Sequence, residues 1–189
     1  MRLTSNGEVR LERAFYARDS PVVAPDLLNK VLVAGDCAGR IVEVEAYRSD
    51  DPASHTYRGR TPRNATMWGP GGLLYVYFTY GMHFCANVTT SVEGDGQAVL
   101  LRAIVPMRGI DVMRSRRPGR SDRILTDGPA KLCQALAIDR RHDGTDLTVD
   151  PGITIADDGT PPPAHPLVTP RIGIRVAVDV PWRWLVPPA

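Results

Sequence analysis

The chain has 189 residues, enough for one domain with a buried core, and its 43% hydrophobic and 23% charged residues argue against a disordered protein. Its formal net charge of +2 is too small to indicate a nucleic-acid partner by itself. No apolar run approaches the ~18 residues of a membrane-spanning helix. The first residues also lack the apolar stretch of a secretory signal, so we expect a cytoplasmic protein with no membrane partner.

The first expected elements are helical. Residues 11–30 have the character of helical pieces, which Pro21 and Pro25 interrupt. The dipeptide Pro25–Asp26 is a typical start for a short helix that continues through Leu28.

Two strands and a long loop come next. Residues 31–33 and 41–47 are rich in β-branched side chains and predict two strands. The turn between them contains Gly35, Asp36 and Gly39. Residues 48–72 are polar and rich in Gly, Pro, Asp and Arg, which predicts a long loop of the kind that usually carries function.

The strongest strand signal covers residues 73–80. It meets a turn at Gly81 and Met82 and returns as far as Val88, which predicts a β-hairpin. Residues 97–105 form another apolar strand, with Arg102 in its middle.

The last part of the chain begins with an expected helix over residues 128–136, where apolar residues recur at helical spacing. Residues 157–166 are acidic and rich in proline, which predicts a surface excursion. Strands are expected to resume at residues 172–174 and 182–184. Together the elements predict one α+β domain over residues 1–189.

The cysteine and histidine residues argue against a metal centre. Cys37, Cys85 and Cys133 are far apart and lack the C-x-x-C spacing of a zinc site, so we expect free thiols in a reducing compartment. His55 has Asp neighbours, but the other histidines show no ligand spacing. A contact between this loop histidine and a base or a phosphate fits better.

Arginine dominates the basic residues, because only Lys30 and Lys131 among the 23 are lysines. Between Arg102 and Arg123 there are seven arginines against two aspartates, which is a local basic stripe suited to a DNA-binding surface. Two alternatives stay open: genome composition for the arginine bias, and a solvated, mobile loop around residues 114–120.

A pair of carboxylates lies in the strand predicted over residues 41–47. Period-2 alternation puts Glu43 and Glu45 on one face with Ile41 and Tyr47, and directs Val42, Val44 and Ala46 into the core. Glutamates of this kind suit the hydrolysis of a glycosidic bond. The alternative is a solvated strand face.

Aromatic residues gather in the predicted hairpin. Tyr75, Tyr77 and Tyr80 lie within six residues, and Tyr75 and Tyr77 share a strand face. Packing accounts for one or two of these rings, whereas Tyr80 belongs to the exposed turn beside Met82. Minor-groove proteins use apolar wedges in such places to separate base steps, and aromatic faces stack flipped bases.

Several blocks of the sequence together resemble one family. These blocks keep their order between residues 25 and 186 and cover residues 39–47, 51–55, 60–64, 75–83, 99–103, 128–136 and 171–174. They are similar to the alkyladenine, or 3-methyladenine, DNA glycosylases. The resemblance implies an α+β fold: a single mixed domain whose curved antiparallel β-sheet has a protruding β-hairpin and peripheral helices.

The resemblance also implies roles for individual residues. Glu45 matches the general base that activates water against the sugar. Tyr47, His55 and Tyr77 match the walls of the base pocket, and Asn87 matches a gate that disfavours guanine. Tyr80 matches the residue that fills the gap left by a flipped base. Met82 lies beside it on the DNA-binding surface, and Arg102 matches a contact to the flipped nucleotide and its phosphates.

This family acts on double-stranded DNA that contains damaged purines, needs no metal or organic cofactor, and forms no covalent enzyme intermediate. The resemblance therefore implies a monomeric, monofunctional DNA-repair hydrolase. Two other functions stay open: a non-catalytic nucleic-acid-binding module of the same shape, and a small carbohydrate hydrolase that uses Glu43 and Glu45. Intact Glu45 argues against the first, and the second gives no role to Tyr80.

Overall fold

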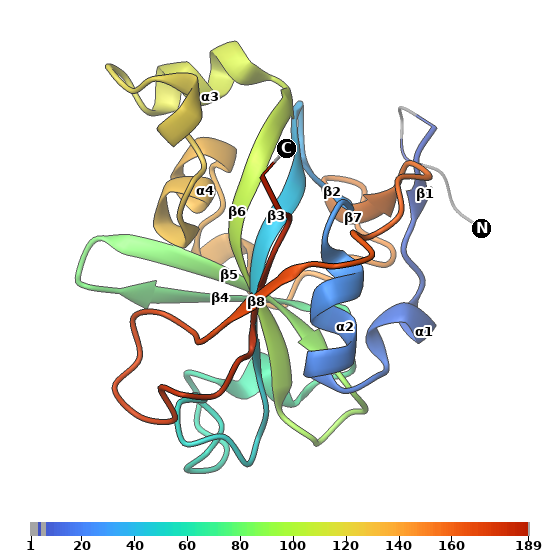
Figure 1. Cartoon of the computed structure of the whole chain (residues 1–189), viewed down its shortest axis with the longest axis vertical. Coiled ribbons are helices and arrows are strands. Elements are labelled where there is room, and N and C mark those ends of the chain that lie inside the picture. The colour runs from blue at the N-terminus through green and yellow to red at the C-terminus, as the bar shows by residue number, and fades with distance from the viewer. Residues whose placement is uncertain (1–3, 5–6, 189) are drawn as a thin grey trace.

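A nine-stranded antiparallel sheet is the centre of the computed structural model, which describes residue 4 and residues 7–188 (Figure 1). The order of neighbours along the sheet is β1-β7-β2-β3-β6-β5-β4. These strands are β1 Val9–Arg10, β2 Val31–Ala34, β3 Cys37–Tyr47, β4 Leu74–Thr79, β5 His83–Thr90, β6 Gln97–Arg108 and β7 Ile153–Asp157. The short strands β8 (Leu167–Thr169) and β9 (Arg183–Leu185) extend the sheet from β3, which β9 contacts directly.

Four α-helices of the described residues lie around the sheet, and the hairpin of β4 and β5 projects from it (Figure 1). They are α1 Arg13–Tyr16, α2 Ser20–Leu27, α3 Ile110–Arg116 and α4 Pro129–Leu136. Helix α2 packs on β3 and β6, and α4 packs on β5 and β6. The predicted α+β class, antiparallel sheet and protruding hairpin are confirmed. Within the described residues, none of the helices has the length and apolar character needed to cross a membrane.

Helix α2 differs from its prediction. It runs without interruption from Ser20 and contains Pro25, so the expected helix start at Pro25 is wrong. Pro21 lies in the first turn, where the missing N–H costs no helical hydrogen bond. Val23 and Leu27 are fully buried against the sheet, and this packing outweighs the local cost of an internal proline.

Strand β3 contains an irregularity that changes which side chains share a face. Ile41 pairs with Ile104 and Val44 pairs with Leu101, and the register shifts twice between these pairs. In a regular strand, residues three positions apart point to opposite faces. The shifts allow Ile41 and Val44 to point to the same face. Ile41 therefore joins the core together with Val44 and Ala46. Its predicted place on the glutamate face is wrong, and so is the predicted place of Val42 in the core, because Val42 is only half-buried and lies outside it.

Other differences concern elements that the pattern did not indicate. Strands β1, β7 and β8 and helix α3 were not predicted, and α3 includes residues 114–116 of the segment for which the mobile-loop alternative was open. Residues 172–174 form no strand. They follow Pro170, and Gly173 adopts a positive φ of +78°, which ends extended pairing locally.

Gly39 lies inside β3 and not in the predicted turn, which is formed by Gly35 and Asp36. A Cβ atom on Gly39 would approach Ile104 Cδ1 to 2.6 Å and the backbone oxygen of Val105 to 2.9 Å. The backbone oxygen cannot move aside without disturbing the pairing of β3 with β6.

We predict that Gly39→Ala lowers the free energy of unfolding by about 1–3 kcal/mol, the usual cost of overpacking. Denaturant unfolding measures this change. The control is Gly152→Ala, where the nearest atom to the added Cβ would be Asp150 Oδ1 at 3.4 Å, with an expected effect within about 0.5 kcal/mol. Equal changes in the free energy of unfolding at the two positions would show that the close approach at Gly39 does not determine the cost of the substitution.

Candidate active site

A cavity of about 490 Å³ opens beside the hairpin, on the side of the sheet opposite the core residues of β3. Its walls come from segments far apart in the sequence: the end of β3, the loop after it, the hairpin, β6 and residues 172–176. The residues predicted for a base pocket all line it, namely Tyr47, His55, Tyr77 and Asn87. Tyr80 and Arg102 line it as well.

The carboxylate of Glu45 lies directly behind this wall. Glu45 is fully buried, and both of its oxygens are hydrogen-bonded. Oε2 accepts from the Tyr47 hydroxyl at 2.8 Å and from Arg102 Nη1 at 3.1 Å, and Oε1 accepts from the backbone N–H of Ile172 at 2.9 Å. All three donor residues also line the cavity, so the charge is held at its edge and in one orientation.

Arg102 connects the two glutamates of β3. Its Nε donates to Glu43 Oε1 at 2.9 Å while its Nη1 donates to Glu45. Glu43 Oε1 also accepts from Arg183 Nε of β9 at 2.7 Å. Burial opposes the charge of Arg102, but the Glu45 and Glu43 carboxylates raise the pKa of its guanidinium. Glu43 thus balances two arginines, and Glu45 is the carboxylate next to the cavity.

Burial raises the pKa of the Tyr47 hydroxyl, and the Glu45 charge that accepts its hydrogen bond raises it further. This hydroxyl therefore stays protonated and remains a donor to Glu45 at neutral pH. Asn87 is also oriented, because its Nδ2 donates to the backbone oxygen of Tyr75 at 3.2 Å.

Three rings form one aromatic wall. The rings of Tyr75 and Tyr77 stack with centroids 5.7 Å apart, and the His55 ring meets Tyr77 edge-on at 4.5 Å. His55 Nδ1 lies 3.0 Å from the Tyr75 hydroxyl. Burial, together with the nearby charge of Arg63, holds the pKa of His55 below its ordinary value. Tyr75 was not predicted as a site residue, although its shared strand face with Tyr77 was the signal for it.

The hairpin tip is exposed. Tyr80 is 83% exposed and Met82 is 70% exposed, so neither side chain is part of a core. Tyr80 and Gly81 have φ values of +51° and +69°, in the left-handed region that tight hairpin turns require. Tyr80 adopts it despite having a side chain, which is uncommon outside turns and functional sites. The predicted exposure of this tip is confirmed.

The basic stripe has partners of its own. Arg114 pairs with Asp111 and Asp122, and Arg117 Nη1 donates to Gln134. In the described part of the chain, no arginine between residues 108 and 123 lines the cavity. The use of this stripe as a DNA-binding surface stays a prediction.

Comparisons with known proteins agree with the geometry. Residues 14–188 match the family model described as Methylpurine-DNA glycosylase (MPG). A protein of Burkholderia lata named "Putative 3-methyladenine DNA glycosylase" is 57% identical over 181 residues, which cover 94% of this chain and 87% of that protein. Proteins of the same name are 49% identical in Carboxydothermus hydrogenoformans (92% of this chain, 93% of that protein) and 45% identical in Rhodopseudomonas palustris (93% and 86%).

The family model spans nearly the whole chain, and these relatives share about half of its residues over most of both lengths. Both findings agree with a buried carboxylate beside an aromatic cavity. The chain belongs to the methylpurine-DNA glycosylase family.

Proposed function

We propose that this protein removes damaged purines, 3-methyladenine among them, from double-stranded DNA by hydrolysing the N-glycosidic bond and leaving an abasic site. The observation that carries the proposal is the Glu45 carboxylate, fixed by three donors behind a cavity with aromatic walls. A base inside the duplex hides its C1′ atom, so the nucleotide has to leave the stack before it reaches the cavity.

The hydrogen bonds of Glu45 leave one of its oxygens, Oε1, able to accept a further hydrogen bond from water. Oε2 accepts two hydrogen bonds, whereas Oε1 accepts one, from Ile172. A carboxylate oxygen has two lone pairs, so Oε1 retains one for a water molecule at the cavity edge. In the proposed reaction Glu45 takes the proton of this water as it attacks C1′. Its charge also stabilises the positive charge that develops on the sugar.

The aromatic wall suits an electron-poor base. Alkylation at a ring nitrogen leaves a purine positively charged, and the face of a tyrosine ring attracts a cation. Tyr47 and Tyr77 provide such rings at the cavity. His55 has a lowered pKa and is neutral near pH 7, so it does not repel a charged base.

Neither lysine is placed to act as a nucleophile, which supports monofunctional hydrolysis. Lys30 pairs with Asp157 and Lys131 pairs with Asp127, and the cavity wall contains neither.

We propose that Tyr80 fills the gap that the flipped base leaves in the stack, with Met82 beside it and Arg102 contacting the flipped nucleotide. The exposure of Tyr80 and Met82 supports the first two roles, and the place of Arg102 in the cavity wall supports the third.

Glu45→Gln should lower the single-turnover excision rate by at least about 10²-fold, the usual scale for a lost general base, with DNA binding retained. The measurement uses a duplex oligonucleotide that contains one damaged purine. Glu43→Gln is the matched control, because Glu43 binds the same arginine. A much larger loss for Glu43→Gln than for Glu45→Gln would mean that the general base is the other carboxylate.

Tyr80→Ala should weaken binding to a lesion-containing duplex by about 1–3 kcal/mol, as for base–aromatic stacking elsewhere, and slow excision from paired sites. It should leave the melting temperature nearly unchanged, because the ring is exposed. Tyr77→Ala should lower both excision and melting temperature, since that ring is part of the wall and of β4. If Tyr80→Ala unfolds the protein while the folded fraction stays fully active, the tip is not a wedge.

His55 should titrate at a pH below the ordinary histidine value of about 6.5, measured from its ring protons by NMR. Arg63→Gln should raise the midpoint partway, because Arg63 is the second cause of the shift after burial. Since folding lowers this pKa, the stability contribution of neutral His55 is complete above the unfolded value and is lost as the pH falls through the folded one. A titration midpoint of His55 at or above the ordinary histidine value would contradict the proposal that this residue of the aromatic wall is neutral near pH 7.

A further inference from the structure

A second pair of buried charges lies behind the cavity wall, and the mechanism above does not use it. The side chains of Arg171 and Asp51 are 0% and 1% exposed. Both guanidinium Nη atoms bond to the Asp51 carboxylate, Nη2 at 3.0 Å, and Nη1 also donates to the backbone oxygen of Ala46 at 3.0 Å. A buried ion pair is weak evidence for stabilisation, because desolvation opposes the attraction.

The pair connects the two loops that form much of the cavity wall. Asp51 Oδ1 also accepts the backbone N–H of Ala53, in the loop that continues to His55. Arg171 directly precedes Ile172, whose N–H donates to Glu45 Oε1. One ion pair therefore holds the His55 loop against the segment that orients the carboxylate.

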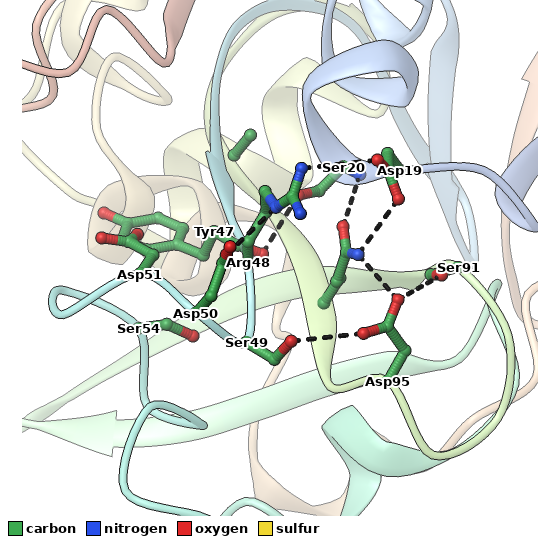
Figure 2. Close-up of polar contacts among 12 residues, drawn as sticks. Asp19, Ser20, Tyr47, Arg48, Ser49, Asp50, Asp51, Ser54, Ser91 and Asp95 are labelled. Atoms are coloured by element: carbon green, nitrogen blue, oxygen red, sulfur yellow. Dashed lines mark hydrogen bonds and ion pairs between the residues drawn. The ribbon is translucent and has the colours of Figure 1, made fainter.

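Arg171 also contacts the pocket residue Tyr47. Its guanidinium carbon lies 4.7 Å from the centre of the Tyr47 ring and 5.3 Å from that of Trp182. The backbone carbonyl of Tyr47 also accepts a hydrogen bond from Ser20 Oγ at 3.1 Å. Figure 2 shows Ser20 and Asp19 in a hydrogen-bond network, which Gln97 continues to Asp95.

Within the described residues, the Nε atom of Arg171 is buried without a hydrogen-bond partner. An unpaired buried donor is unfavourable, so the side chain is not arranged for the largest number of hydrogen bonds. In this arrangement the Arg171 guanidinium lies against the Tyr47 ring, and the backbone N–H of the following residue, Ile172, donates to Glu45.

We propose that Arg171, anchored by Asp51, is a positioning residue that fixes the orientation of the Glu45 carboxylate and of the Tyr47 ring. The role of this orientation in excision rests on the proposed function. The Arg171 side chain is fully buried and does not line the cavity, so we expect its loss to lower the rate constant of the chemical step and to affect DNA binding much less.

The first test measures single-turnover excision and duplex binding for Arg171→Gln, Asp51→Asn and Arg171→Lys. Displacement of a catalytic group by about 1 Å costs roughly 10²-fold in rate, which is the loss expected for Arg171→Gln, with the Kd changed less than about threefold. Arg171→Lys keeps the charge but lacks the planar fork and should restore part of the rate. If Arg171→Gln does not fold, Asp51→Asn and Arg171→Lys make the same comparison.

Lys30→Met is the matched control, because it breaks the ion pair of the buried Lys30 with the partly exposed Asp157, between segments that do not line the cavity. It should lower the melting temperature and leave the single-turnover rate constant of the folded protein unchanged. If the Arg171 and Asp51 variants behave in the same way as Lys30→Met, the pair is only structural and the proposal is overturned.

The second test does not depend on activity. Amide hydrogen exchange at Ile172 should be at least about tenfold faster in Arg171→Gln and Asp51→Asn, because loss of the anchor frees its hydrogen bond to a charged acceptor. Lys30→Met should leave this exchange unchanged. If the wild-type protein excises no damaged purine, the proposed function fails. The positioning of Glu45 by Arg171 is then supported by faster exchange at Ile172 and overturned by unchanged exchange.

Discussion

The fully buried carboxylate of Glu45 is the group around which the site is built. A carboxylate out of water is strongly unfavourable unless charges and hydrogen-bond donors compensate it. Arg102 provides the charge, and Tyr47 and Ile172 provide the further donors. These donors come from β3, from β6 and from a segment near the end of the chain, so the charge can be buried only when all three are assembled. The irregular pairing of β3 with β6 lets Ile41 and Val44 both enter the core while Glu43, Glu45 and Arg102 meet on the other side.

The proposed function requires two tasks, action on the sugar and contact with the duplex, and the same arrangement separates them. Groups that act on the sugar need fixed positions, because donors that are already oriented do not reorganise during the reaction. Glu45, Tyr47 and Arg102 meet this condition through short contacts with buried partners. Contact with the duplex needs side chains that extend into solvent. The hairpin tip provides them, since Tyr80 and Met82 protrude from a turn whose backbone conformation is set by positive φ values.

Features encoded by neighbouring residues could be predicted from the sequence, whereas features that depend on distant segments could not. The strong strand signal of residues 73–80 and the turn at Gly81 and Met82 were enough to predict the hairpin, and the two-residue period of a strand was enough to predict the shared face of Tyr75 and Tyr77. The Asp51–Arg171 pair joins residues 120 positions apart, and no periodicity indicates it. The irregularity in β3 was equally hidden, because it depends on register with β6 and not on the composition of β3. The apolar residues 172–174 suggested a strand, but their backbone turns away from the sheet to reach Glu45 and the cavity.

The distribution of charge explains why a net charge of +2 is compatible with a DNA substrate. Three arginines are neutralised inside the protein by specific carboxylates: Arg102 and Arg183 by Glu43, and Arg171 by Asp51. These cations set geometry and contribute little to the external field. Local rather than total charge therefore governs the site, because screening weakens interactions beyond about 8–10 Å at physiological salt. In the proposed function, recognition of an electron-poor base depends on the aromatic cavity and on one fixed anion directly behind its wall.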